Sequence, residues 1–175
     1  MLKYLYPHEY IDSVFSIDFK KLHDKGYRGI IFDIDNTLVH NNEGSNEAVD
    51  NLFKELQLIG FKTILLTDNS VERVQTFIKN IDTPYIALAQ KPKVSGYKQS
   101  LRILELDKSE VVYIGDQLFT DILGANMCRI QCILVEFLRK DDETYFGKRR
   151  AVEKKILTRY KKNKKYLHRL GGISK

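Results

Sequence analysis

Two acidic residues stand two positions apart directly after an apolar run in this chain of 175 residues. The run is Ile30-Ile31-Phe32; Asp33 and Asp35 follow it, and Thr37 lies two residues further on. A buried strand of a parallel sheet reads as a continuous apolar run and delivers the next residue to the sheet edge where α/β proteins bind ligands. Carboxylates this close repel each other, and burying them is costly unless a cation or a proton compensates. The segment is therefore typical of a catalytic or magnesium-binding site.

Further apolar runs alternate with helical patterns along the chain. Strands are predicted over residues 30–33, 62–67, 84–87, 111–114 and 132–135. The intervening helices are predicted to begin after Ser45 or Asn46 and end at Gly60, to begin after Ser70, to begin near Ser95, and to span 121–127. Five strands alternating with helices predict an α/β fold whose parallel sheet is covered by helices on both faces.

Polar residues follow four of these strands, and parallel strands bring such residues to one edge of the sheet. They are Asp33 and Asp35, Thr67 and Asn69, Lys91, and Asp116 and Asp121. Taken singly, Thr67 also suits a plain strand end, Lys91 a solvated loop and Asp121 the acidic first turn of a helix. Asp33 and Asp35 are harder to explain structurally, because an acid that ends a buried strand needs a partner.

Together these segments resemble the four motifs of the haloacid dehalogenase (HAD) superfamily of aspartyl-phosphate enzymes. Residues 33–37 match its first motif, 64–67 its second, Lys91 its third and 115–121 its fourth. The resemblance implies a Rossmann-like fold with Asp33 as the nucleophile and Asp35 as the general acid and then the general base. An acid at position 35 is what phosphohydrolases of the superfamily carry.

The same resemblance implies a Mg²⁺ cofactor and a set of phosphate ligands. Asp33, the backbone carbonyl of Asp35, and Asp116 would hold the metal, with Asp121 supporting it directly or through another ligand. The phosphate would be bound by Thr67, Asn69 and Lys91.

The spacing of the motifs leaves no room for a cap domain. Residues 39–66 separate the first motif from Thr67, and residues 68–90 separate Thr67 from Lys91. Each interval holds about one loop and one helix. Superfamily members without caps tend to act on bulky substrates such as proteins, nucleic-acid ends or lipid head groups, because their site is open.

Residues 6–18 and 33–39 look like the start of the YqeG-type phosphatases, subfamily IIIA of the superfamily, and the similarity extends to about Val135. This group is related to mitochondrial phosphatidylglycerophosphatases. The resemblance thus implies phosphatidylglycerophosphate, a phospholipid, as the substrate. A nucleic-acid end, a phosphoprotein or a soluble phosphomonoester is the alternative substrate, and a non-enzymatic RNA-associated protein is the alternative class.

The chain divides by charge into residues 1–137, a phosphatase domain with an N-terminal helical segment, and 138–175, a basic extension. The extension holds 14 Lys and Arg against 4 Asp and Glu, whereas the remainder holds 15 against 19. A helix is predicted over 147–170, with Tyr160 and Tyr166 suited to a lipid headgroup region. The predicted partner is an anionic membrane surface; a helix docked on the core and nucleic-acid binding are the alternatives.

Composition is that of an intracellular globular protein. No apolar run approaches the roughly 20 residues that span a bilayer, and the first residues lack a signal peptide's apolar core. Cys128 and Cys132 are too close in sequence for a disulfide between them to link distant parts of the fold, and they lack neighbouring His or Cys residues that could complete a metal site. We expect a cytoplasmic location, peripheral on the inner face of the cell membrane. The sequence leaves the oligomeric state open.

Overall fold

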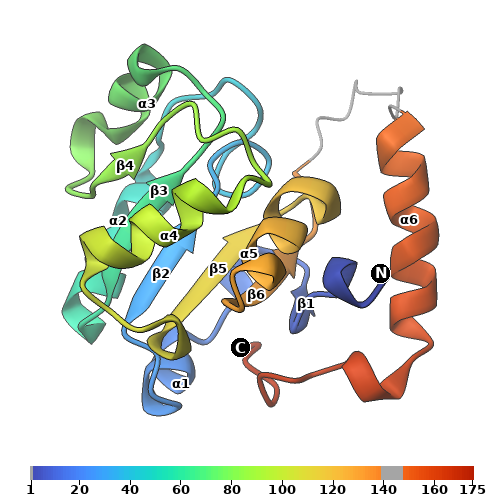
Figure 1. Ribbon diagram of the computed structural model, residues 1–175. Coiled ribbons are helices and arrows are strands. Elements are labelled where there is room, and N and C mark those ends of the chain that lie inside the picture. Colours follow the sequence, from blue (N-terminus) through green and yellow to red (C-terminus); the bar gives the residue numbers. More distant parts are fainter. Residues whose placement is uncertain (1, 139–147) are drawn as a thin grey trace.

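The computed structural model describes residues 2–138 and 148–175, and its centre is a parallel sheet of six strands (Figure 1). The strand order is β1-β6-β5-β2-β3-β4. The strands are β1 (Glu9–Ile11), β2 (Gly29–Phe32), β3 (Lys62–Leu66), β4 (Tyr85–Ile86), β5 (Val111–Gly115) and β6 (Gln131–Val135). The five strands predicted from the sequence are all present, and the α/β architecture is confirmed.

The sixth strand, β1, was not predicted. It pairs in parallel with β6 at the sheet edge, where Tyr10 lies opposite Leu134. The N-terminal segment is therefore not simply helical, because this strand lies between short helical turns, η1 (Leu2–Leu5) and η2 (Val14–Ser16). A strand of three residues is too short to show a period in the sequence, so only its pairing with β6 identifies it.

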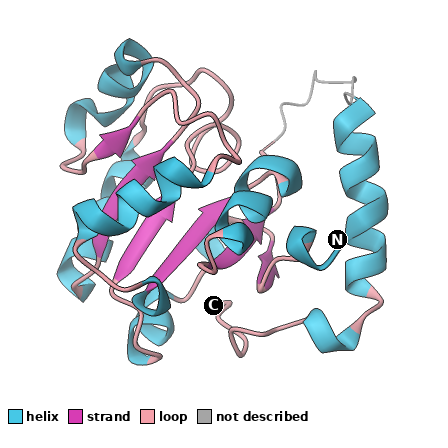
Figure 2. Cartoon of the chain, viewed as in Figure 1, coloured by secondary structure: helices cyan, strands magenta, loops and turns pink. Residues whose placement is uncertain are grey.

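Helices cover both faces of the sheet, as predicted (Figures 1 and 2). One core cluster lies under α1 (Phe19–Asp24), α2 (Glu47–Ile59) and α3 (Val71–Phe77). The other lies under α4 (Val94–Leu104), α5 (Leu123–Met127) and α6 (Lys148–Lys161). The remaining short turns are η3 (Ile78–Asn80), η4 (Lys108–Glu110), the π-helical η5 (Leu118–Ile122) and η6 (Lys164–Tyr166). Within β2, Ile30 and Phe32 face the first cluster and Ile31 the second, as alternation along a strand requires.

The helix boundaries near the site follow from local capping. The Asn46 side chain accepts a hydrogen bond from the Val49 amide at 3.0 Å, and α2 ends at Gly60 with a left-handed φ of 104°. The Ser70 side chain caps α3 by accepting from the Arg73 amide at 3.3 Å. These caps confirm both predicted helix starts and fix the orientation of the loops that carry the polar residues.

The C-terminal extension packs on the core instead of standing apart from it. Ile156 and Tyr160 of α6 are buried, and the Tyr160 ring lies 5.6 Å from that of Tyr6. The chain then returns beside the N-terminal segment, where Ile173 is buried and its carbonyl accepts a hydrogen bond from the Asp18 amide at 2.7 Å. The helix that was predicted to reach residue 170 ends at Lys161, and its predicted start at Gly147 lies outside the described residues.

Burial in this position overturns the expectation that Tyr160 faces lipid, because its side chain is inside the core. The docked helix was one of the alternatives weighed from the sequence. Of the helices described in the structure, none is both long and apolar enough to cross a membrane.

Candidate active site

The carboxyl ends of the three central strands carry the predicted site residues. Asp33 follows β2, Thr67 follows β3 and Asp116 follows β5. The register places Phe32 of β2 opposite both Leu65 of β3 and Ile114 of β5, so the three strands end at nearly the same level. This common edge is why side chains far apart in the sequence converge.

Lys91 is the cation at the centre of the cluster. Its ammonium nitrogen Nζ lies 2.6 Å from Oδ1 of Asp33 and 2.7 Å from Oδ1 of Asp121. The Tyr113 hydroxyl also donates a hydrogen bond to that Asp121 oxygen at 2.8 Å. Burial alone would disfavour the charged amine, but Asp121 and Asp33 outweigh it and raise the pKa of Lys91 above its ordinary value. Lys91 therefore stays charged and ties the first, third and fourth motifs together.

Asp33, Asp116 and Asp121 form a buried acidic cluster in which one oxygen from each lies within 4.8 Å of the others. Burial raises the pKa of Asp33 to about 8, with Lys91 opposing the shift and Asp121 and Asp116 adding to it. Burial also raises the pKa of Asp116 to about 7 against the effect of Arg150. Three carboxylates whose oxygens lie this close fit a divalent cation such as Mg²⁺, because its charge would offset their repulsion.

Asp121 can join this cluster because the strand end beside it is a glycine. A Cβ added to Gly115 would lie 2.6 Å from Cγ of Asp121. The other oxygen of Asp121 accepts a hydrogen bond from the Gln117 amide at 2.9 Å. The loop after β5 therefore wraps around the Asp121 side chain and leaves no space for a larger residue at position 115.

The Asp35 carboxylate has its own set of hydrogen-bond donors. Its Oδ1 accepts hydrogen bonds from Arg73 Nη2 at 2.9 Å and from the Asn42 amide at 3.0 Å. Its Oδ2 accepts from the Asn69 side-chain amide at 2.5 Å. Asn36, which follows Asp35, has a left-handed φ of 61°. These partners hold the Asp35 side chain against Arg73 of α3 and the two neighbouring loops.

The structure brings the predicted phosphate ligands to the same edge, with different roles for their side chains. The Thr67 hydroxyl accepts a hydrogen bond from the Asn69 amide at 3.3 Å, and its own hydrogen remains available for a phosphate oxygen. The Asn69 side chain is engaged by Asp35, so it holds the acid in place. The Lys91 backbone amide donates to Asp68 Oδ1 at 2.8 Å, which fixes the loop that carries the lysine.

Sequence reasoning missed three charged residues of the site. Arg73 of α3 contacts Asp35, and Arg150 of α6 forms an ion pair with Asp116. Glu153 lies one turn after Arg150 and is 4% exposed. The available signal was that Glu153 is the one acidic residue in the basic sequence of α6, three positions after an arginine.

Comparison with known proteins agrees with this geometry. The family model of the haloacid dehalogenase-like hydrolases matches residues 45–128. The chain is 34% identical over 161 residues to "Probable phosphatase YqeG" of Bacillus subtilis, covering 91% of this chain and 94% of that protein. A crystal structure of an uncharacterized Listeria monocytogenes protein matches with a TM-score of 0.54 at 18% identity, covering 78% of this chain and 99% of that one, and so supports the fold. The chain therefore belongs to the haloacid dehalogenase-like hydrolases and, within them, to the YqeG-type phosphatases.

Proposed function

We propose that this protein is a Mg²⁺-dependent phosphomonoesterase that transfers the phosphoryl group to Asp33 and then to water. The observation that carries the proposal is the buried contact of Lys91 with both Asp33 and Asp121, beside Asp116. This arrangement supplies a nucleophile, a fixed cation and a set of metal ligands at one point. When bound, Mg²⁺ would neutralise charge on the phosphoryl oxygens.

The residues have distinct roles in the two steps. Lys91 engages Oδ1 of Asp33, which leaves Oδ2 to attack phosphorus while the bond to the leaving oxygen breaks. Asp35 gives its proton to that oxygen, and afterwards takes a proton from the water that attacks the aspartyl-phosphate, restoring Asp33. Both transfers require Oδ2 of Asp35 to exchange its Asn69 partner for the reacting oxygen. The Thr67 hydroxyl and Lys91 hold the phosphate throughout.

The substrate we propose is phosphatidylglycerophosphate, presented at an anionic membrane surface. A cavity of about 670 Å³ adjoins Asp116 between β6 and α6, and its wall is partly apolar. Apolar lining comes from Leu118, Leu134, Val135, Phe137, Leu138 and Leu157. The charged lining is mixed, with the bases Arg150, Lys154 and Lys161 and the acids Asp12, Asp116, Glu136 and Glu153. Such a cavity beside an uncapped site suits a lipid-linked leaving group because its apolar surface can cover part of the glycerol backbone and acyl chains.

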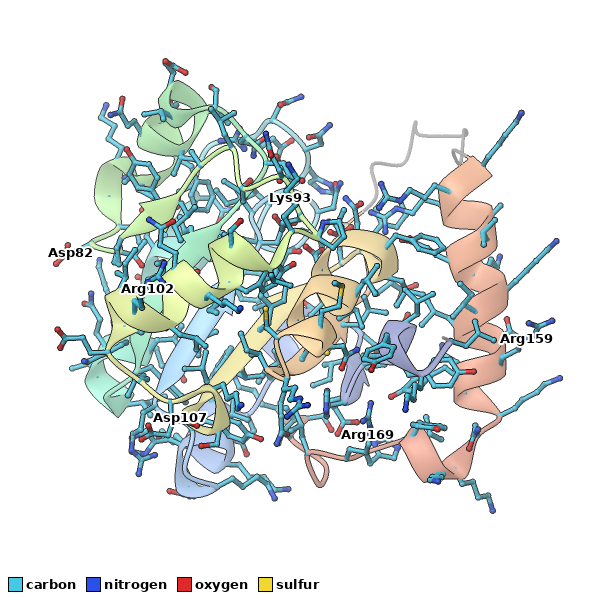
Figure 3. All side chains as sticks on the ribbon, viewed as in Figure 1. Asp82, Lys93, Arg102, Asp107, Arg159 and Arg169 are labelled. Carbon is cyan, nitrogen blue, oxygen red and sulfur yellow. The ribbon has the colours of Figure 1, made fainter. Side chains whose placement is uncertain are left out.

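The exposed face of α6 supports a location at the membrane. Lys155 and Arg159 are exposed there, and Figure 3 shows Arg159 pointing away from the sheet. Each lysine or arginine near an anionic leaflet contributes on the order of 1 kcal/mol. The same face also favours a second candidate, a phosphorylated nucleic-acid end, because its cations would meet phosphates equally well.

Phosphate release measured on four substrates tests the proposal. These are phosphatidylglycerophosphate in mixed micelles, a 5′-phosphorylated oligonucleotide, a phosphopeptide and a soluble sugar phosphate, each with Mg²⁺ and with EDTA. We expect the highest kcat/KM on the lipid and no turnover with EDTA. Asp33→Asn should abolish turnover, while Asp24→Asn, an exposed acid on α1, should leave it unchanged. Preference for another substrate would overturn the lipid assignment; turnover by Asp33→Asn would overturn the mechanism.

Liposome sedimentation tests the membrane face separately. The double variant Lys155→Glu/Arg159→Glu should lose binding to phosphatidylglycerol vesicles, and added salt should weaken binding of the unsubstituted protein. The matched control is Arg102→Glu/Lys108→Glu, which changes the charge by the same amount at exposed positions of α4 and η4. Equal loss in both variants would mean that net charge, and not the α6 face, governs binding.

A further inference from the structure

The C-terminal helix contributes a cation to the acidic cluster. Arg150 Nη2 forms an ion pair with Oδ2 of Asp116, and its Nη1 donates to the backbone carbonyl of the same residue at 2.9 Å. Figure 1 shows α6 standing at the end of the sheet beyond β6 and β1, so this contact joins the extension to the site. We propose that Arg150 is a positioning residue that holds Asp116 ready to bind the metal. The inference rests on the Mg²⁺-dependent function proposed above.

Arg150 is held in place by contacts that do not involve Asp116. Its Nη1 lies 3.0 Å from Oε2 of Glu153, one turn later on α6. The other oxygen of Glu153, Oε1, accepts hydrogen bonds from the backbone amides of Leu118 at 3.0 Å and Phe119 at 3.4 Å. Glu153 therefore anchors the guanidinium to the same loop that carries Asp116 and Asp121. Because Asp116 and Glu153 both hold the guanidinium of Arg150, it needs little reorganisation when a metal binds.

The contact with Arg150 uses one oxygen of the Asp116 carboxylate and would leave the other for a metal. Arg150 takes Oδ2, while Oδ1 lies 3.5 Å from the Thr37 hydroxyl and remains for a metal. Without Arg150, this buried carboxylate would lose both its fixed orientation and its compensating charge. Residues that hydrogen-bond a metal ligand typically change metal affinity by about 10- to 100-fold when they are removed. A simple competitor for Asp116 would have the opposite effect, because its loss would strengthen metal binding.

Calorimetric titration of the full chain with Mg²⁺ separates these possibilities. We expect Arg150→Met to bind Mg²⁺ about 10- to 100-fold more weakly than the unsubstituted protein, and Arg150→Lys to fall between them. Arg159→Met removes the same charge from the exposed face of the same helix and should leave Mg²⁺ binding unchanged. Circular dichroism and thermal unfolding establish that each variant is folded.

Phosphate release provides a second measurement that a general loss of structure would not reproduce. In Arg150→Met the half-saturating Mg²⁺ concentration should rise by the same factor as the calorimetric dissociation constant. At saturating Mg²⁺ the KM for substrate should change less than about threefold, because the phosphate ligands Thr67 and Lys91 are intact.

Each outcome decides the proposal. Equal or tighter Mg²⁺ binding by Arg150→Met overturns the positioning role and leaves the proposed function standing. Failure of the unsubstituted protein to bind Mg²⁺ overturns both. Should Arg150→Met not fold, Arg150→Lys decides: it keeps the charge but cannot contact Asp116 Oδ2, the Asp116 carbonyl and Glu153 together. Its affinity should fall about three- to tenfold, and an unchanged affinity overturns the proposal.

Discussion

Stability of the metal-free protein should fall as pH rises from 6.5 to 8.5, and Mg²⁺ should reverse the trend. The perturbed groups are Asp33, whose pKa is raised to about 8, and Asp116, whose pKa is raised to about 7. The folded state thus retains protons that the unfolded chain, with an ordinary pKa of 3.8, has already released. Stability that these groups confer is fully present below that ordinary value and is lost as pH rises through the folded pKa values. Over the stated window the loss is about 2–3 kcal/mol.

Thermal unfolding in EDTA and in saturating Mg²⁺, at pH steps across the window, measures this effect. For a chain of this size the loss corresponds to a Tm about 5–10 °C lower at pH 8.5 than at pH 6.5 in EDTA. Bound Mg²⁺ favours the ionised carboxylates, so the Tm increase that it produces should grow with pH. Asp116→Asn removes one titrating group and should flatten the EDTA curve. A metal-free Tm that is constant or rises over the window, or a Mg²⁺ effect independent of pH, would refute the assignment of raised pKa values.

Three further substitutions test other contacts. Arg73→Met removes the 2.9 Å contact to Asp35 and should lower kcat by about 10- to 100-fold in phosphate release; an unchanged kcat would exclude a role in orienting the acid. Gly124→Ala places a Cβ 2.4 Å from the buried Tyr97 ring and should lower the free energy of unfolding, measured with denaturant, by about 1–3 kcal/mol. In the control Gly44→Ala the added Cβ meets nothing within 4 Å, and the free energy of unfolding should fall by less than about 0.5 kcal/mol. Equal costs would contradict the packing argument. Tyr160→Phe removes a buried hydroxyl without a hydrogen-bond partner among the described residues and should raise Tm by about 2–4 °C; a lower Tm would mean that the hydroxyl is satisfied.

The parts of the site that lie next to central strands could be predicted from the sequence, because an apolar run marks both the strand and the residue that ends it. Asp33, Thr67 and Asp116 follow such runs, and all three lie at the predicted edge. Lys91 follows a strand of only two residues, β4, and was identified by its motif. Its actual partners, Asp33 and Asp121, depend on how the loop folds back across the sheet.

The missed parts depend on contacts between elements that no local pattern records. The edge strand β1 can be recognised only from its pairing with β6. Arg73 reaches Asp35 because the capped start of α3 directs its first turn toward the loop that carries Asp35. In α6 residue type does not indicate burial, since the apolar Val152 is 48% exposed whereas Glu153 is buried. Glu153 can be buried because Arg150 and the backbone amides of η5 satisfy its charge. The hydrophobic periodicity of the sequence gives no information on such polar partners.

The charges of the site explain why a second fixed cation is useful there. Asp33, Asp116, Asp121 and Glu153 face Lys91 and Arg150, which leaves two net negative charges when all are ionised. A divalent cation would bring this sum to zero, so a phosphate dianion would no longer meet a negatively charged site. Arg150 offsets acidic charge at Asp116, whereas Thr67 and Lys91 are the proposed phosphate ligands, so loss of Arg150 should act mainly on metal binding. The extension that carries Arg150 would thus be part of the metal site of the phosphatase core.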